Sequence, residues 1–212
     1  MELYVNPEIA EDIIAISKSF NVDAQIIGRD YVSGAMENTT AVIHGEQANQ
    51  MKGQLIDENK QENTIAHEVF HHWFGNLVTS ESWSNLALNE SFANYSEYLW
   101  REHKYGKENA DAHLFETIKA YKDDKDNFDK KLVRFNYADK EDMFDAVSYN
   151  KGGAILHMLR KYVGDEAFFL SLKKFLTENK YKAAEVHQLR LTFEEVTGKD
   201  LNWFFDQWFY GS

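Results

Sequence analysis

The feature that most constrains this chain is a His-Glu-x-x-His pattern that begins at His67, inside a segment whose apolar residues repeat at helical spacing. Because an α-helix turns once every 3.6 residues, His67 and His71 point to nearly the same side and can reach one metal ion. Glu68 is rotated by about 100° from His67 around the helix axis, which suits a base rather than a ligand. We expect a mostly buried helix over residues 57–77.

A third ligand is offered by Glu90, which follows His71 after eighteen intervening residues. Glu90 begins another segment of helical apolar spacing, and a second helix would bring its carboxylate back to the first. Catalytic zinc sites use three protein ligands and one open position, and two histidines with a glutamate are a recurring set. A buried helix whose histidines bond carbonyl groups is the alternative, and Glu90 weighs against it. The sequence therefore predicts one Zn²⁺ per chain, bound by His67, His71 and Glu90.

These residues and three further motifs resemble the gluzincin aminopeptidases of the aminopeptidase N and leukotriene hydrolase type. Residues 73–76 read Trp-Phe-Gly-Asn, and residues 89–93 read Asn-Glu-x-Phe-Ala. Residues 34–38, Gly-Ala-Met-Glu-Asn, match the exopeptidase signature of that family, and residues 149–152, Tyr-x-Lys-Gly, match the segment with its catalytic tyrosine. The resemblance spans nearly the whole chain, and it implies the thermolysin-like catalytic domain without the flanking domains of full-length members.

The resemblance also implies roles for individual side chains in peptide hydrolysis. Glu68 would take a proton from the attacking water as general base and later return it to the leaving amine. Tyr149 would stabilise the oxyanion that forms at the scissile carbonyl. Glu37 would bind the free α-ammonium group of the peptide. The residues that would shape the pocket for the first side chain are Ala35, Met36 and Asn38.

A supporting carboxylate is predicted from helical spacing. Glu97 lies seven residues after Glu90, two helical turns on, so the two side chains share a face. A zinc-bound histidine normally donates its other ring proton to a carboxylate or a carbonyl group. We therefore expect Glu97 to support a ligand histidine. The six other histidines are expected to be structural or solvated: His44, His72, His103, His113, His157 and His187.

The fold class indicated by these patterns is α+β and predominantly helical, with a small N-terminal β part beside a helical lobe and the metal between them. We treat residues 1–212 as one metallopeptidase catalytic domain. The stretch 123–142 is dense in both charges and is expected to be a solvated loop. The expected helices cover 7–20, 57–77, 89–103, 107–122, 151–163, a segment beginning at 165, 185–196 and 201–209, and the expected strands cover 24–32 and 40–44.

Charge and composition limit the partners. The net charge of -12 opposes binding to nucleic acid or to an anionic membrane surface. No stretch approaches eighteen apolar residues, so no membrane span is expected, and a chain without cysteine has neither disulfides nor thiolate ligands. Neither feature indicates a cellular compartment. The expected partners are peptides with a free N-terminus and the flanking domains of a longer parent protein.

Three functions remain open from the sequence. The leading hypothesis is a zinc aminopeptidase that hydrolyses the N-terminal peptide bond. A zinc endopeptidase or an epoxide hydrolase on the same frame would share the metal, the base and the tyrosine, but an endopeptidase has no free amine for Glu37 to bind. Outside enzymes, the alternative is a non-catalytic module stabilised by zinc.

Overall fold

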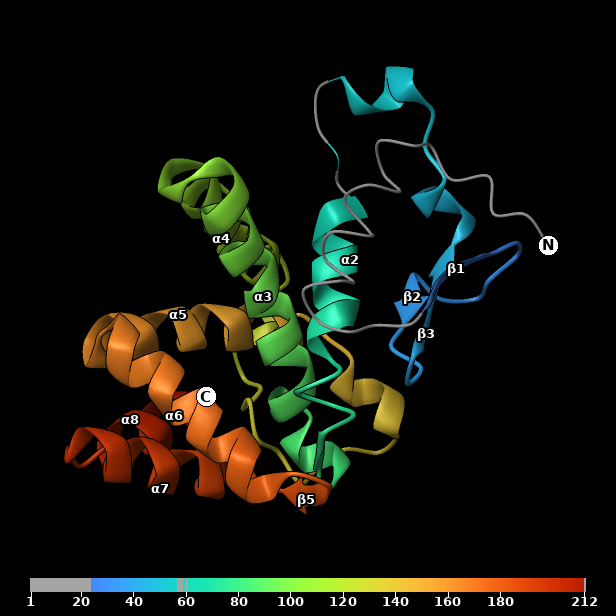
Figure 1. Cartoon of the computed structure of the whole chain (residues 1–212). Helices are drawn as coiled ribbons and strands as arrows, with labels where there is room; N and C mark the ends of the chain where they lie inside the picture. Colours follow the sequence, from blue (N-terminus) through green and yellow to red (C-terminus); the bar gives the residue numbers. More distant parts are fainter. Residues whose placement is uncertain (1–23, 57–58, 60, 212) are drawn as a thin grey trace.

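The computed structural model describes residues 24–56, 59 and 61–211. A small sheet within residues 24–45 stands beside the helix of residues 61–70, and the helices from residue 87 onward form a larger lobe on the other side (Figure 1). This is the predicted α+β, predominantly helical class. The helix expected over residues 7–20 lies outside the described residues. No helix in the described part of the chain is long and apolar enough to span a membrane.

The sheet has the strand order β1-β3-β2. Strands β1 (Ala24–Gly28) and β3 (Ala41–Gly45) pair in parallel, and β2 (Ala35–Met36) pairs antiparallel with β3. The prediction that the first strand extends to residue 32 is wrong, because Asp30 has a positive φ of 54° and turns the chain after Gly28. Strand β2 was not predicted, since two residues carry no alternation of apolar and polar side chains.

Helices α2 (Gln61–Phe70) and α3 (Ala87–Tyr105) pack against each other, and α2 also packs on the sheet through a small cluster of Val42, Ile65 and Val69. All three side chains of this cluster are fully buried. Burying a side chain of this size contributes about 1.5 to 3 kcal/mol relative to leaving it exposed. The cluster therefore fixes α2 between the sheet and α3.

The predicted end of α2 at residue 77 is wrong, because the α-helix ends at Phe70. Gly75 has a φ of 148°, and a Cβ there would lie 2.8 Å from the carbonyl oxygen of His71. A residue with a side chain would be strained in this conformation. Gly75 thus allows the chain to leave the helix in a close turn directly after His71.

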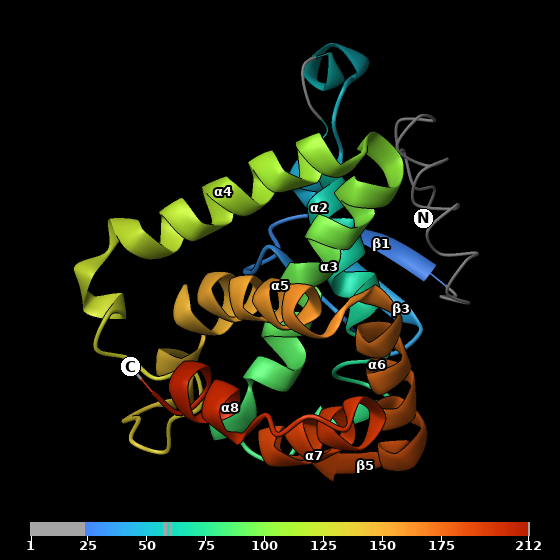
Figure 2. The same ribbon diagram turned by 90° about the vertical axis from the view of Figure 1, so that its left-hand side faces the viewer.

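The large core lies where α3, α5, α6, α7 and α8 meet, and much of it is aromatic. Figure 2 shows α5 between α4 on one side and α7 and α8 on the other. A parallel pair that was not predicted, β4 (Val78–Ser80) with β5 (Lys182–Ala184), closes one end of this lobe. The remaining helices of the lobe lie close to their predicted ranges. They are α4 (Lys107–Asp123), α5 (Gly152–Val163), α6 (Asp165–Asn179), α7 (Val186–Thr197) and α8 (Asn202–Trp208).

The stretch 123–142 is irregular apart from short 3₁₀ turns, but the prediction of a solvated loop is wrong for its centre. Leu132 is 0% exposed and Val133 is 3% exposed, because both belong to the large core. The prediction from the high charge of this stretch overlooked two apolar residues that the helical lobe buries.

A π-helix (Val147–Lys151) precedes α5, where the sequence predicted only the α-helix from residue 151. Asp145 Oδ1 accepts hydrogen bonds from the backbone N–H groups of Val147 and Ser148, each at 3.1 Å. Lys130 and Arg134 contact the same carboxylate through Oδ2, at 3.0 and 2.8 Å. The start of the π-helix is therefore tied to the preceding loop.

Gly152 lets α5 approach α3 closely, and we expect Gly152→Ala to destabilise the domain. A Cβ at this position would overlap Ser91 Oγ, and Ser91 is itself buried and donates a hydrogen bond to the Ser148 carbonyl oxygen. Overpacking of this kind costs about 1 to 3 kcal/mol of the free energy of unfolding, measurable by urea denaturation. Gly53→Ala, where a Cβ meets nothing within 4 Å, is the control and should change it by less than about 0.5 kcal/mol. Equal stability of the two variants would contradict the tight packing at Gly152.

Candidate metal centre

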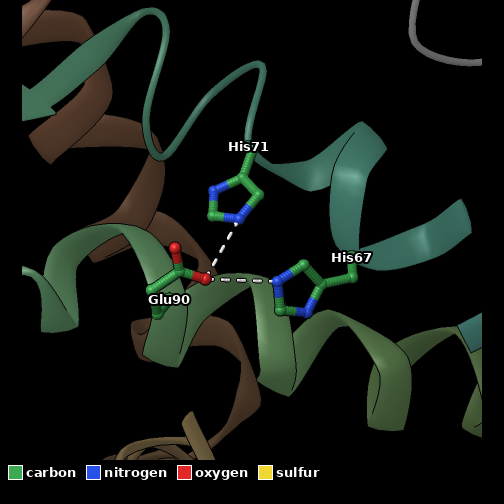
Figure 3. A group of neighbouring side chains, drawn as sticks. All are labelled: His67, His71 and Glu90. Atoms are coloured by element: carbon green, nitrogen blue, oxygen red, sulfur yellow. Dashed lines mark hydrogen bonds and ion pairs between the residues drawn. The ribbon is translucent and has the colours of Figure 1, made fainter. Parts of the chain in front are cut away.

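Three side chains, from α2, the turn that follows it and α3, converge in a buried group (Figure 3). His67 lies on α2, His71 follows the end of that helix, and Glu90 lies in the first turn of α3. Glu90 Oε2 is 3.2 Å from His67 Nε2 and 3.3 Å from His71 Nε2. All three residues are at most 8% exposed. The structure thus brings together the three ligands that the sequence predicted.

The spacing of these atoms fits a tetrahedral zinc ion. Ligand atoms held 2.0 to 2.2 Å from zinc at tetrahedral angles are roughly 3.3 to 3.5 Å apart. The two distances to Glu90, 3.2 and 3.3 Å, are close to that value. Two imidazoles and one carboxylate are also a ligand set that zinc uses in catalytic sites. Zn²⁺ is therefore the cofactor that this group fits.

The second nitrogen of each imidazole is held by a partner outside the ligand group. Nδ1 of His67 lies 3.1 Å from Glu97 Oε1, and Nδ1 of His71 lies 3.0 Å from the carbonyl oxygen of Phe74. An Nδ1–H that donates to these acceptors leaves each Nε2 lone pair directed at the position between the ligands. The structure places Glu97 beside His67, and its role as a support for metal binding stays a prediction.

The electrostatic surroundings favour positive charge at this position. Burial opposes protonation of His67, but hydrogen bonds from its ring to Glu90 and Glu97 outweigh that cost and raise its pKa to about 10. Burial disfavours the Glu90 carboxylate, yet its hydrogen bonds to His67 and His71 outweigh this and lower its pKa to about 2. Carboxylates that stabilise charged imidazoles equally favour a divalent cation.

Glu68 lies beside this group with a carboxyl group suited to proton transfer. It is 6% exposed, and burial raises its pKa to about 7, against the opposing charges of His67 and His71. A carboxyl group with a pKa near neutral can both accept and return a proton. Glu68, Glu37 and His71 also form a group whose ligand-type atoms lie within 4.8 Å of one another.

Glu37 reaches the metal centre from the segment after β2. Its Oε1 lies 3.9 Å from His71 Nδ1, and the side chain is 17% exposed. Asn76 Nδ2 donates a hydrogen bond of 2.8 Å to the backbone carbonyl oxygen of Glu37, which ties this segment to the turn after α2. Asn76 is the last residue of the Trp-Phe-Gly-Asn motif, and its hydrogen bond to Glu37 was not predicted from the sequence.

The other residues expected to bind substrate are neighbours of Glu37. Ala35 and Met36 form β2, the edge strand that pairs with β3. Ala35 is half-buried, whereas Met36 and Asn38 are exposed. These residues are close to Glu37 in the chain, and Glu37 contacts His71. Their role in binding the first side chain of a substrate stays a prediction.

Tyr149 approaches the group from the π-helix. Its ring stacks on that of His67, with centroids 5.7 Å apart and an interplanar angle of 9°. Burial and the neighbouring Glu90 raise the pKa of Tyr149, so its hydroxyl group keeps its proton at neutral pH. A protonated phenol beside the ligands can donate a hydrogen bond to an oxyanion.

A histidine that sequence reasoning placed among the structural or solvated ones lies close to this group. His113, on α4, has its Nε2 3.2 Å from Glu97 Oε2. The contact depends on how α4 folds back on α3, and no motif or spacing in the sequence signals that arrangement.

Comparisons with known sequences point to one family. The sequence profile of the peptidase family M1 domain matches residues 8–208. Aminopeptidase N of Lactococcus lactis subsp. lactis is 32% identical in an alignment 223 residues long that covers 95% of this chain and 25% of that protein. Aminopeptidase M1-A of Oryza sativa subsp. japonica is 36% identical in an alignment 190 residues long that covers 84% of this chain and 21% of that protein. The chain thus spans a quarter or less of the length of these relatives.

Solved structures share the fold. Aminopeptidase A of Legionella pneumophila, in complex with aspartic acid, matches with a TM-score of 0.76 at 23% identity and covers 96% of this chain and 24% of that one. An M1 zinc metallopeptidase of Deinococcus radiodurans matches with a TM-score of 0.76 at 22% identity, covering 99% of this chain and 45% of that one. The chain therefore shares the arrangement of helices and strands seen in these two structures.

Proposed function

Because the chain belongs to peptidase family M1, we propose that it is a zinc-dependent aminopeptidase catalytic domain that hydrolyses the N-terminal peptide bond of peptides. The observation that carries the proposal is the convergence of Glu37 and Glu68 on the buried ligand group of His67, His71 and Glu90. A buried base beside a second carboxylate that can pair with a substrate ammonium suits cleavage next to a free amine.

The ligand group would bind zinc, which supplies Lewis-acid activation of water at neutral pH. Glu68, buried and with a pKa near 7, accepts the proton from the attacking water and passes it to the leaving amine. Tyr149 donates a hydrogen bond to the carbonyl oxygen as negative charge develops on it. One carboxyl group therefore serves both halves of the reaction.

Glu37 would define the exopeptidase character. Its carboxylate lies next to the ligands and is only partly exposed, so an α-ammonium group could pair with it while the first peptide bond reaches the metal. The surrounding carboxylates of Glu68 and Glu90 add to the attraction of a cationic amine. Ala35, Met36 and Asn38 would form the wall against the first side chain.

We expect Glu37→Ala to lower kcat/KM for free peptides about ten- to more than a hundredfold at unchanged zinc content. The reason is the loss of a charge-assisted contact worth about 1.5 to 3 kcal/mol next to the reacting bond. Glu37→Gln keeps the shape and should lose nearly as much, whereas Glu116→Ala, an exposed carboxylate on α4, should leave activity unchanged.

The comparison of free and N-acetylated peptides separates this proposal from its alternatives. The unmodified domain should cleave the free peptide much faster, and Glu37→Ala should lose most of that preference. Equal cleavage of both peptides by the unmodified domain would instead favour a zinc endopeptidase. Zinc binding without any chelator-sensitive hydrolysis of an amino-acid anilide would favour a non-catalytic zinc module.

Residues 1–212 would act as one catalytic domain of a longer protein. The coverage of the relatives supports this, since the chain matches 25% and 21% of their lengths. The partners of the domain would be peptides with a free N-terminus and the flanking domains of its parent chain.

A further inference from the structure

We propose that His113 on α4 is a positioning residue of the metal centre, because it fixes the Glu97 carboxylate that orients the ligand His67. The inference rests on the proposed zinc site and extends it to a third helix. His113 touches neither the ligand group nor a substrate; it would act through Glu97.

The two oxygens of Glu97 have separate partners. Oε1 lies 3.1 Å from His67 Nδ1 and accepts a hydrogen bond from Asn94 Nδ2 at 3.3 Å. Oε2 lies 3.2 Å from His113 Nε2. The carboxylate therefore has a hydrogen-bond partner from α2 at one oxygen and a close neighbour from α4 at the other.

The contact between His113 and Glu97 is sheltered from solvent. The side chains are 17% and 15% exposed, and the Nε2 atom of His113 is buried. It lies within ion-pair distance of Glu97 Oε2, but the contact does not have the geometry of a hydrogen bond. Among the described residues, Glu97 is the acceptor that this nitrogen faces. A buried polar atom is costly to leave without a partner, so a small rotation that completes a hydrogen bond from His113 Nε2 to Glu97 Oε2 would be favoured and would restrict the rotamers of both residues.

Orientation of Glu97 matters because it sets the direction of His67. A carboxylate free to rotate could offer His67 either oxygen at several angles, and the Nε2 lone pair would move with the ring. A hydrogen bond from His113 to Oε2 would favour one arrangement, in which Oε1 contacts Nδ1 of His67 and Nε2 of His67 contacts Glu90. Partners of ligand histidines are known to control metal affinity through such orientation.

The other histidines outside the ligand group have different surroundings. His44 contacts Gln25, and His157 contacts Tyr95. His187 is about half exposed and lies 3.5 Å from Glu185. Within the described part of the chain, His113 is the non-ligand histidine that reaches a carboxylate supporting a ligand.

The test compares zinc affinity in His113→Leu, His113→Gln and the control His187→Leu. The dissociation constant would be measured at fixed pH by competition with a chromogenic chelator, with the melting temperature of each metal-free protein recorded beside it. Loss of a direct partner of a ligand costs ten- to a hundredfold in affinity. For a residue one contact further out, we expect His113→Leu to weaken zinc binding about three- to thirtyfold. His113→Gln, whose amide can still donate to Glu97, should recover most of the affinity, and His187→Leu should match the unmodified protein.

A folded His113→Leu variant with unchanged zinc affinity would overturn the inference, and so would a glutamine variant as weak as the leucine one. If the leucine variant does not fold, long-range ¹H–¹⁵N NMR of the unmodified protein decides. His113 must carry a proton on Nε2, and an unprotonated Nε2 would overturn the inference. Failure of the unmodified protein to bind zinc would defeat the proposed function and this inference with it, whereas normal zinc binding with an indifferent His113 would defeat only the inference.

Discussion

Glu68→Gln is expected to abolish nearly all peptide hydrolysis while the domain keeps its zinc. The amide has the size of the carboxyl group and can still form hydrogen bonds in the buried position, but it cannot take the proton of the attacking water. General-base catalysis typically contributes 10²- to 10⁴-fold, so kcat should fall by about that factor. The measurement is steady-state kinetics on an amino-acid anilide, together with elemental analysis of the same preparation.

Glu81→Gln is the matched control, because Glu81 is an exposed residue that follows β4. Its kinetics should equal those of the unmodified domain. If Glu68→Gln retained near-native turnover in a domain with measurable activity, the proton would have to move through another group, and the role proposed for Glu68 would be wrong. If Glu68→Gln lost zinc together with activity, Glu68 would contribute to metal binding and would not act as a general base alone.

Glu90→Gln is expected to remove the metal itself. The unmodified domain, prepared without chelator, should contain about one zinc per chain, as a site with three protein ligands predicts. In the variant a neutral amide replaces the carboxylate that lies 3.2 and 3.3 Å from the two imidazoles. Removing a ligand should weaken binding more than removing a supporting partner does, so we expect a loss of more than about a hundredfold.

The loss of zinc affinity in Glu97→Gln is the reference against which the loss in Glu90→Gln is judged. It leaves all three ligands in place and alters only the support of His67, so its loss of zinc affinity should be ten- to a hundredfold and smaller than that of Glu90→Gln. Far-UV circular dichroism would establish that both variants are folded. A Glu90→Gln domain that bound zinc as tightly as the unmodified one would show that Glu90 is not a ligand.

Helical periodicity explains why most of the metal centre could be predicted from sequence. The four-residue interval between His67 and His71 and the seven-residue interval between Glu90 and Glu97 both follow from 3.6 residues per turn. Each interval places two side chains on one face without knowledge of the tertiary structure. The position of Glu37 came from its motif alone, because periodicity says nothing about a carboxylate that follows a two-residue strand.

The features that sequence reasoning missed all depend on contacts between distant segments. The end of α2 at Phe70 is set by the turn at Gly75, where the backbone approaches His71. The burial of Leu132 in a highly charged stretch follows from the helices that cover it. His113 reaches Glu97 only because α4 lies along α3. Local sequence patterns do not predict which distant segments contact each other.

The β4–β5 pair has a consequence for the order in which the centre can assemble. The turn that follows His71 leads into β4, whose partner β5 lies about a hundred residues further along the chain. Backbone hydrogen bonds from Tyr181 to Leu77 and from Glu81 to Ala184 add to this junction. During synthesis from the N-terminus, both histidines and Glu90 leave the ribosome long before β5 exists. The ligands are therefore made early, but the strand that braces the exit from the metal helix is made about a hundred residues after that exit.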